Sequence, residues 1–220
     1  MSIRAQIEEL RASLPKDVTL VAVSKFHPVE ALREAYEAGQ RIFGESRPQE
    51  MVAKQPQLPD DVEWHMIGHL QTNKVKYIAP FVALIHSVDS ERVVAEIDRQ
   101  AARCGRIIDI LFEVHLAEDE SKSGWDESEL REFISSGALE RYPNVRVRGL
   151  MTIGTLTDDI ELNKAEFRVL RALFEALRDR FGAEFDTVSM GMTSDYREAI
   201  ECGSTMVRIG SKIFGERNYN

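Results

Sequence analysis

The chain has 220 residues, of which 43% are hydrophobic and 30% are charged, and its formal net charge is −9. This balance excludes collagen-like repeats and a fully disordered chain, and the longest apolar runs, such as Phe81–Ile85, are too short to cross a bilayer. An acidic chain with no block of Lys or Arg is also a poor candidate for binding nucleic acid.

The first segment, residues 1–14, predicts an amphipathic helix and lacks the apolar stretch of a secretion signal. Only two cysteines occur, Cys104 and Cys202, and they do not form a C-x-x-C pair. We therefore expect a reduced, cytoplasmic protein with no metal site built on thiolates. The helix is expected to pack outside a single domain that spans residues 1–220.

Eight short runs of apolar and β-branched residues recur along the rest of the chain, each bounded by turn residues. Strands are predicted at Val18–Lys25, Arg41–Ser46, Glu63–Gly68, Leu84–Asp89, Asp109–Val114, Arg146–Ile153, Asp186–Gly191 and Thr205–Gly210. The segments between them have apolar residues at helical spacing, as in Pro28–Ala38, Ser90–Cys104 and Glu161–Phe181. Eight strands that alternate with helices predict a parallel sheet closed into a (β/α)8 barrel. An open doubly wound sheet is the alternative, but that fold has a glycine-rich loop after its first strand, and here the first strand ends instead in Ser24-Lys25-Phe26.

Lys25 ends the first predicted strand, at the end of the barrel where barrel enzymes place their sites. A lysine that is partly desolvated beside other cations has a lowered pKa, and its free amine attacks aldehydes. Nearly every residue before Lys25 is apolar, so alternation does not show which side of this strand faces inward. An exposed lysine at a strand end is the alternative.

Glycine and hydroxyl residues follow the seventh and eighth predicted strands, in Ser189–Asp195 and in Arg208–Lys212. Each loop leads into a helix, the second one predicted at Lys212–Glu216. Glycine lets backbone N–H groups approach an anion, hydroxyls donate hydrogen bonds, and these two loops of a barrel frequently bind phosphate. Either loop alone could simply cap a helix, but together they predict a phosphate site.

His65 and His69 are four residues apart, a spacing that can indicate a metal site. They flank Gly68 and the end of a strand instead of sharing one face of a helix, and no metalloprotease glutamate lies between them. We therefore expect a structural or pocket-lining role.

Seven segments carry a resemblance to a known family: Val21–Lys25, Phe43–Glu45, His65–Lys74, Arg148–Ile153, Ser189–Thr193, Arg208–Ser211 and Ile213–Gly215. In this order they resemble the pyridoxal 5′-phosphate (PLP) homeostasis protein family, also called the YggS or proline synthetase co-transcribed group. The resemblance covers essentially the whole chain. It implies the barrel fold of the N-terminal domain of alanine racemase.

The resemblance also implies the roles of individual residues. Lys25 would hold PLP as a Schiff base, and Arg208 would face the pyridine nitrogen. The phosphate would be surrounded by Ser189, Thr193, Gly210 and Ser211, partly through backbone N–H groups. Many members have asparagine where this chain has Ser46 and His115, so the resemblance does not extend to the ring contacts at these two positions.

Two functions are compatible with such a site. The resemblance implies a PLP-binding protein that stores, buffers or delivers PLP inside the cell, with PLP-dependent apoenzymes as recipients and without catalytic turnover. The alternative is a weak amino-acid racemase, which needs acid–base groups on both faces of its substrate. In alanine racemase the second group is a tyrosine from another domain, across a dimer. We expect no room for that domain after Gly215, regard Tyr219 as a poor substitute, and expect a monomer. A phosphosugar aldolase would share only the fold.

Overall fold

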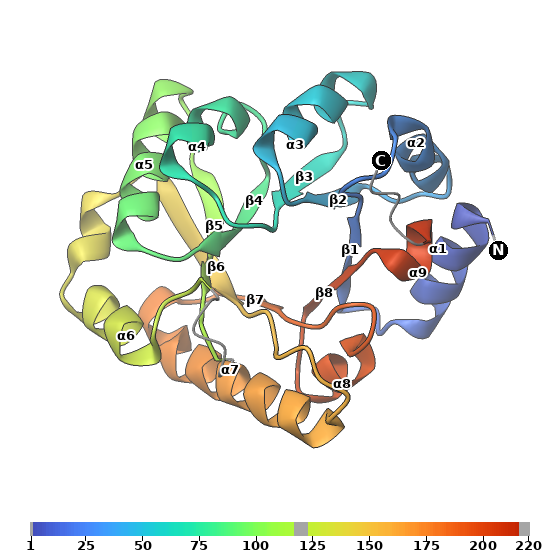
Figure 1. Ribbon diagram of the computed structural model, residues 1–220. Helices are drawn as coiled ribbons and strands as arrows, with labels where there is room; N and C mark the ends of the chain where they lie inside the picture. Colours follow the sequence, from blue (N-terminus) through green and yellow to red (C-terminus); the bar gives the residue numbers. More distant parts are fainter. Residues whose placement is uncertain (1, 117–122, 216–220) are drawn as a thin grey trace.

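The structure is a computed structural model, and it describes residues 2–116 and 123–215. Eight parallel strands form a closed barrel in chain order, with β8 paired to β1 (Figure 1). The strands are β1 (Thr19–Val23), β2 (Ile42–Glu45), β3 (Glu63–Met66), β4 (Leu84–Val88), β5 (Ile108–Glu113), β6 (Val145–Met151), β7 (Thr187–Ser189) and β8 (Met206–Ile209). The predicted (β/α)8 barrel is confirmed, and all eight strands lie where the sequence predicts them.

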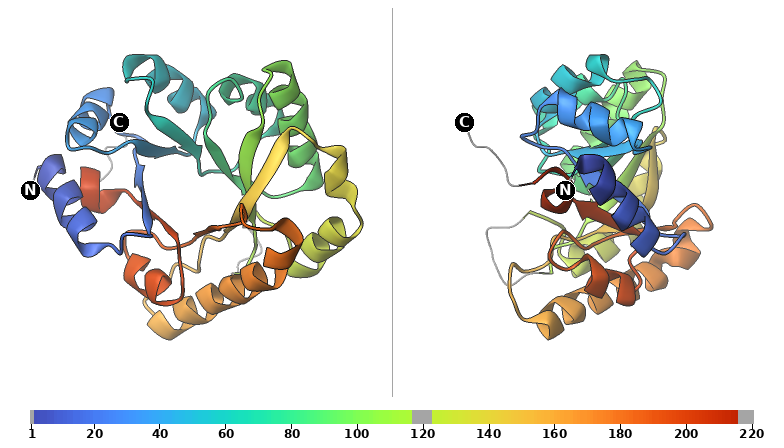
Figure 2. Two further views of the ribbon diagram at one scale, coloured as in Figure 1. Left: turned by 180° about the vertical axis from the view of Figure 1, so that it is seen from behind. Right: turned by 90° about the vertical axis from the view of Figure 1, so that its right-hand side faces the viewer.

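Helices surround the barrel on its outer side (Figure 2). They are α1 (Ile3–Ser13), α2 (Val29–Glu37), α3 (Pro48–Lys54), α4 (Thr72–Ile78), α5 (Glu91–Arg103), α6 (Glu127–Ser135), α7 (Ile160–Phe181), α8 (Tyr196–Glu201) and α9 (Ser211–Phe214). The extra N-terminal helix is confirmed as α1, which lies beside α2 and α9 and buries Ile7 and Leu10. Among the described residues, no helix combines the length and the apolar character needed to span a membrane.

The predicted strands extend further at their carboxyl ends than the observed ones. Strand β1 ends at Val23 and β8 ends at Ile209, so Lys25 and Gly210 lie in the loops that follow. These residues end the hydrogen-bonded pairing because the chain turns there toward the next helix. The helix predicted at Lys212–Glu216 is α9, with Glu216 outside the described residues.

The core has two parts. The larger part fills the space between the strands and the helices and includes Ala22. The smaller part lies inside the barrel and contains Val21, Leu84, Leu111, Met151 and Met206. Because side chains alternate along a strand, Val21 inside the barrel places Val23 on the same side. Lys25 lies beyond the end of β1, so this alternation does not fix the direction of its side chain.

Candidate functional site

Lys25 follows the last residue of β1, Val23, by two positions and is half-buried at the carboxyl end of the barrel. The loop after β8 passes directly against this end of β1. A Cβ atom at Gly210 would lie 3.1 Å from the carbonyl oxygen of Val23 and 3.2 Å from its Cβ. The absence of a side chain at position 210 is therefore what lets the eighth loop approach the segment that carries Lys25.

The two predicted phosphate loops are in contact with each other. The N–H of Gly210 donates a hydrogen bond to Oγ1 of Thr193 over 3.3 Å. Thr193 is half-buried and Ser211 is exposed. Within the described residues, the backbone N–H groups of Thr193, Ser194 and Ser211 face no hydrogen-bond acceptor. Hydroxyls and unengaged N–H groups from two loops therefore lie together, which is the donor set that a phosphate requires.

Arg208 lies inside the barrel and is only 4% exposed. Its Nη1 donates to Oγ of Ser189 over 2.6 Å, and its Nη2 donates to the carbonyl oxygen of Thr152 over 2.8 Å. Burial lowers the pKa of Arg208 to about 10, so the group remains a cation at neutral pH. Two hydrogen bonds fix the plane of this guanidinium.

Ser189 has a more interior position than its expected phosphate role suggests. Its side chain is fully buried, and its hydroxyl contacts Arg208 and Nδ1 of His86, the latter over 3.0 Å. The structure therefore brings Ser189 to Arg208, and a contact between Ser189 and phosphate stays a prediction. His86 continues the chain of contacts, because its Nε2 lies 3.0 Å from Nδ1 of His65.

The two histidines inside the barrel are neutral at physiological pH. Burial lowers the pKa of His65 to about 3, and burial together with the charge of Arg208 lowers the pKa of His86. His65 has the structural position that its sequence context indicated. His69 lies apart from it, with 59% of its side chain exposed and an Asp89 oxygen 3.1 Å away. In the part of the chain that the structure describes, no three His, Cys, Asp or Glu residues are grouped to hold a metal ion.

Glu113 also contributes to this site, because its carboxylate interacts electrostatically with Arg208, although no sequence motif indicated it. It is the last residue of β5 and is 3% exposed. Its Oε1 accepts from the Ser123 hydroxyl over 3.3 Å, whereas its Oε2 has no partner among the described residues. Burial, assisted by the charge of Asp89, raises the pKa of Glu113 to about 7. The sequence does offer one signal for Glu113, because an acidic residue ends a strand that is otherwise largely apolar.

Replacing Glu113 with glutamine is expected to change how stability depends on pH. The folded protein holds a proton on Glu113 up to about pH 7, whereas the unfolded chain releases it near 4.5. The stabilising contribution of this group is therefore complete below pH 4.5 and is lost as the pH rises through 7. A pKa shift of this size corresponds to about 3 kcal/mol in the free energy of unfolding. Urea unfolding of both proteins from pH 4.5 to 8 should show Glu113→Gln gaining stability relative to wild type as the pH rises. A constant difference would contradict the prediction.

The two positions that depart from the family pattern are ordered by backbone contacts. Ser46 lies against Gly68, where an added Cβ would be 2.7 Å from the Cβ of Ser46. The N–H of His115 donates to the carbonyl oxygen of Trp125 over 2.9 Å, which extends the pairing beyond β5. Their contacts with a cofactor ring stay untested.

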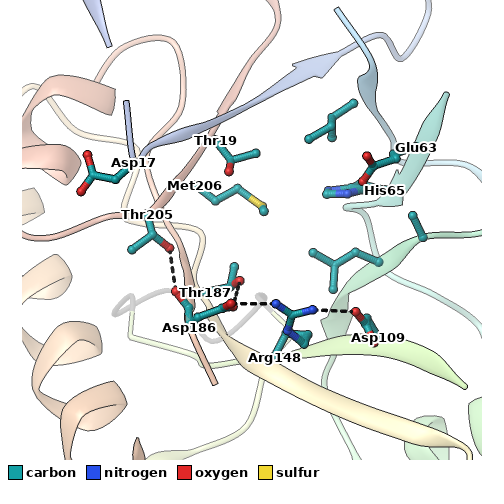
Figure 3. Close-up of a pocket in the computed structure, with 13 residues that line it drawn as sticks. Asp17, Thr19, Glu63, His65, Asp109, Arg148, Asp186, Thr187, Thr205 and Met206 are labelled. Carbon is teal, nitrogen blue, oxygen red and sulfur yellow. Dashed lines mark hydrogen bonds and ion pairs between the residues drawn. The ribbon is translucent and has the colours of Figure 1, made fainter. Parts of the chain in front are cut away.

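A pocket of about 530 Å³ lies at the opposite, amino-terminal end of the barrel (Figure 3). Its lining includes Arg148, which forms ion pairs with Asp109 at 3.1 Å and with Asp186 at 2.7 Å. These charged groups satisfy one another, and this end of a barrel contributes to stability in enzymes of the fold. We therefore place the candidate site at the carboxyl end, where Lys25, Arg208 and the two loops converge.

Comparison with known proteins gives a consistent result. The profile of the family described as alanine racemase, N-terminal domain, matches residues 1–218. The pyridoxal phosphate homeostasis protein of Aquifex aeolicus is 43% identical over 201 residues, which cover 91% of this chain and 87% of the relative. The structure of PipY from Synechococcus elongatus with PLP bound is similar with a TM-score of 0.89 and 39% identity, over 97% of this chain and 100% of PipY. Alanine racemase from Streptomyces lavendulae shares only the fold, with 20% identity and a TM-score of 0.74 over 97% of this chain and 56% of the racemase.

Proposed function

The chain belongs to the pyridoxal phosphate homeostasis protein family, and on that premise we propose that it binds PLP inside the cell with Lys25 as the point of covalent attachment. The observation that carries the proposal is the convergence of a lysine, a buried arginine and two glycine-containing loops at one end of the barrel. Bound PLP supplies an aldehyde that condenses with amines. The protein supplies the amine, the phosphate donors and the fixed cation.

The residues present fit PLP in their chemistry. Thr193, Gly210 and Ser211 offer hydroxyl and N–H donors to the phosphate, and Gly210 keeps this cradle open beside β1. Lys25 extends from the adjacent end of β1. Arg208 stands at the end of β8, where its charge would face the ring nitrogen. The phosphate, the aldehyde and the ring nitrogen of PLP would therefore each have a separate partner.

Arg208 also supports a binding role without turnover. A guanidinium beside the ring nitrogen disfavours protonation of that nitrogen, which makes the ring a weaker electron sink. Its two hydrogen bonds and its burial hold the charge in place. The relatives are named for homeostasis instead of for a reaction. We propose that the protein stores, buffers or delivers PLP to apoenzymes, as a cytoplasmic monomer in which residues 1–220 form one PLP-binding domain.

The first test is whether the purified protein retains PLP and where. The protein is incubated with PLP, the excess is removed, and the visible absorption spectrum is recorded. Borohydride reduction followed by peptide mass mapping then locates the fixed pyridoxyl group. We expect a retained visible band and a pyridoxyl group on the peptide that contains Lys25. A protein that retains no PLP would contradict the proposal and direct attention to phosphosugar ligands for the same loops.

A second measurement separates binding from turnover. The PLP-loaded protein is incubated with L-alanine and with other amino acids, and both enantiomers are quantified over long times with alanine racemase as a positive control. We expect no racemisation above the rate of free PLP. Enantiomer exchange at a higher rate would favour the racemase alternative. Tyr219, which we regard as a poor substitute for the second acid–base group, lies outside the described residues.

A further inference from the structure

The backbone next to Lys25 has an unusual conformation. Phe26 has φ of +66°, and it is the only non-glycine residue with positive φ in the part of the chain that the structure describes. Bulky side chains rarely adopt this left-handed region because Cβ lies too close to the backbone. Such a conformation persists only when surrounding contacts hold it. The turn that carries Lys25 therefore depends on contacts from neighbouring elements.

Helix α3 supplies two of these contacts, one on each side of Lys25. The N–H of Phe26 donates to Oε1 of Glu50 over 2.7 Å, and Nζ of Lys54 donates to the carbonyl oxygen of Ser24 over 2.9 Å. The two peptide groups that flank the Cα atom of Lys25 are therefore both anchored. The anchors are joined, because Nζ of Lys54 lies 2.7 Å from the same oxygen of Glu50.

The ion pair is largely buried, with 20% of the Glu50 side chain exposed, and the three N–H donors of Lys54 each have an acceptor. The Lys54 side chain is 8% exposed, and its third contact is Oε1 of Glu45 at 2.8 Å. Glu45 is fully buried and also accepts from the Ser24 hydroxyl over 2.7 Å. Buried ion pairs add little net stability compared with apolar residues of similar volume. The main effect of this pair is therefore to hold the backbone of Ser24 and Phe26 in place.

We infer that Glu50 and Lys54 are positioning residues for Lys25, clamping both of its peptide groups so that its amine is presented at the mouth of the barrel. The inference rests on the proposed role of Lys25 in holding PLP. It links helix α3, which lies outside the barrel, to the orientation of a residue at the barrel mouth. A movement of α3 would therefore also move the turn that contains Lys25.

A double-mutant cycle tests the clamp. Glycine adopts positive φ without penalty, so Phe26→Gly removes the need for Glu50 to hold the turn. Glu50→Ala is expected to weaken PLP retention about tenfold when Phe26 is present, as loss of a hydrogen bond to a charged group implies. In the Phe26→Gly background the same substitution should weaken retention by about twofold or less, because the two residues are coupled. An equal loss in both backgrounds, or no loss in either, would overturn the inference.

Two further variants separate positioning from general damage. Glu50→Gln keeps an oxygen acceptor for the Phe26 N–H, so it should retain PLP within about threefold of wild type. Glu37 is an exposed glutamate on the neighbouring helix α2, and Glu37→Ala should match wild type. If Glu50→Ala does not fold, the comparison of Glu50→Gln with Lys54→Met carries the test. Lys54→Met should weaken retention more, and equal retention would overturn the inference.

A measurement without PLP distinguishes failure of this inference from failure of the proposed function. Amide hydrogen exchange at Phe26 is followed by NMR in the ligand-free protein. Glu50→Ala should accelerate this exchange at least about tenfold more than exchange in strand β5, because the N–H loses its acceptor. Unchanged exchange would overturn the clamp even if PLP binds. If the wild-type protein does not bind PLP but the exchange accelerates, the proposed function fails and the clamp stands.

Discussion

Replacing Lys25 with alanine is expected to abolish covalent retention of PLP while the barrel stays folded. Lys25 lies after β1 and outside both parts of the core. Substitutions away from a core usually change the free energy of unfolding by less than about 1 kcal/mol. The phosphate loops remain, so PLP should bind reversibly and wash out. The visible band after removal of excess PLP and the peptide map after borohydride measure the loss.

Lys16 provides a matched control for this experiment. It is an exposed lysine that precedes the same strand, at the opposite end of the barrel. Lys16→Ala should retain the band and the adduct on Lys25. Persistence of a reduced pyridoxyl group in Lys25→Ala would show that another lysine holds the cofactor. Lys212 is the neighbour to map first, although its Nζ lies 3.1 Å from a Glu9 carboxylate oxygen.

The fold was predictable because its signals are local. Each strand is a short apolar run with turn residues at its ends, and each helix has apolar residues at helical spacing. The end points were less predictable. Strands β1 and β8 end at Val23 and Ile209, so the chain leaves the sheet before it reaches Lys25 and Gly210. Where pairing stops depends on the neighbouring strands, which a sequence segment does not show.

The site was predictable only in part. The order of strands predicted that the loops containing Thr193 and Gly210 would meet, and they share a hydrogen bond. Glu113 and the Glu50–Lys54 pair were missed because their role depends on which side of a strand or helix faces the barrel. The positive φ of Phe26 has no local signal, since phenylalanine does not favour it. It arises from a contact with Glu50, 24 positions away.

Replacing Gly149 with alanine is expected to destabilise the protein more than a substitution at any exposed glycine. Strand β6 has an irregular register here, since Ile110 pairs with Val147 whereas Leu111 pairs with Gly149. On its other side, Gly149 faces Thr187 of β7. A Cβ atom at position 149 would lie 1.7 Å from the Thr187 carbonyl oxygen. The strands would have to separate, which breaks their hydrogen bonds and the packing of the barrel interior.

The expected cost is at least about 3 kcal/mol, which combines overpacking with disruption of the sheet. Urea unfolding measures it as a lower midpoint at an unchanged slope. Gly137→Ala is the matched control, because Gly137 has a left-handed backbone, with φ of +75° and ψ of 4°, but open space around its Cβ position. Backbone strain alone should cost it about 1–2 kcal/mol. Equal costs at the two positions would mean that β6 and β7 do not approach each other closely at Gly149. A larger loss of unfolding free energy at Gly149 would show that the added Cβ clashes with the Thr187 backbone. That clash would explain why the Arg148–Ile153 segment has glycine where the register of β6 shifts.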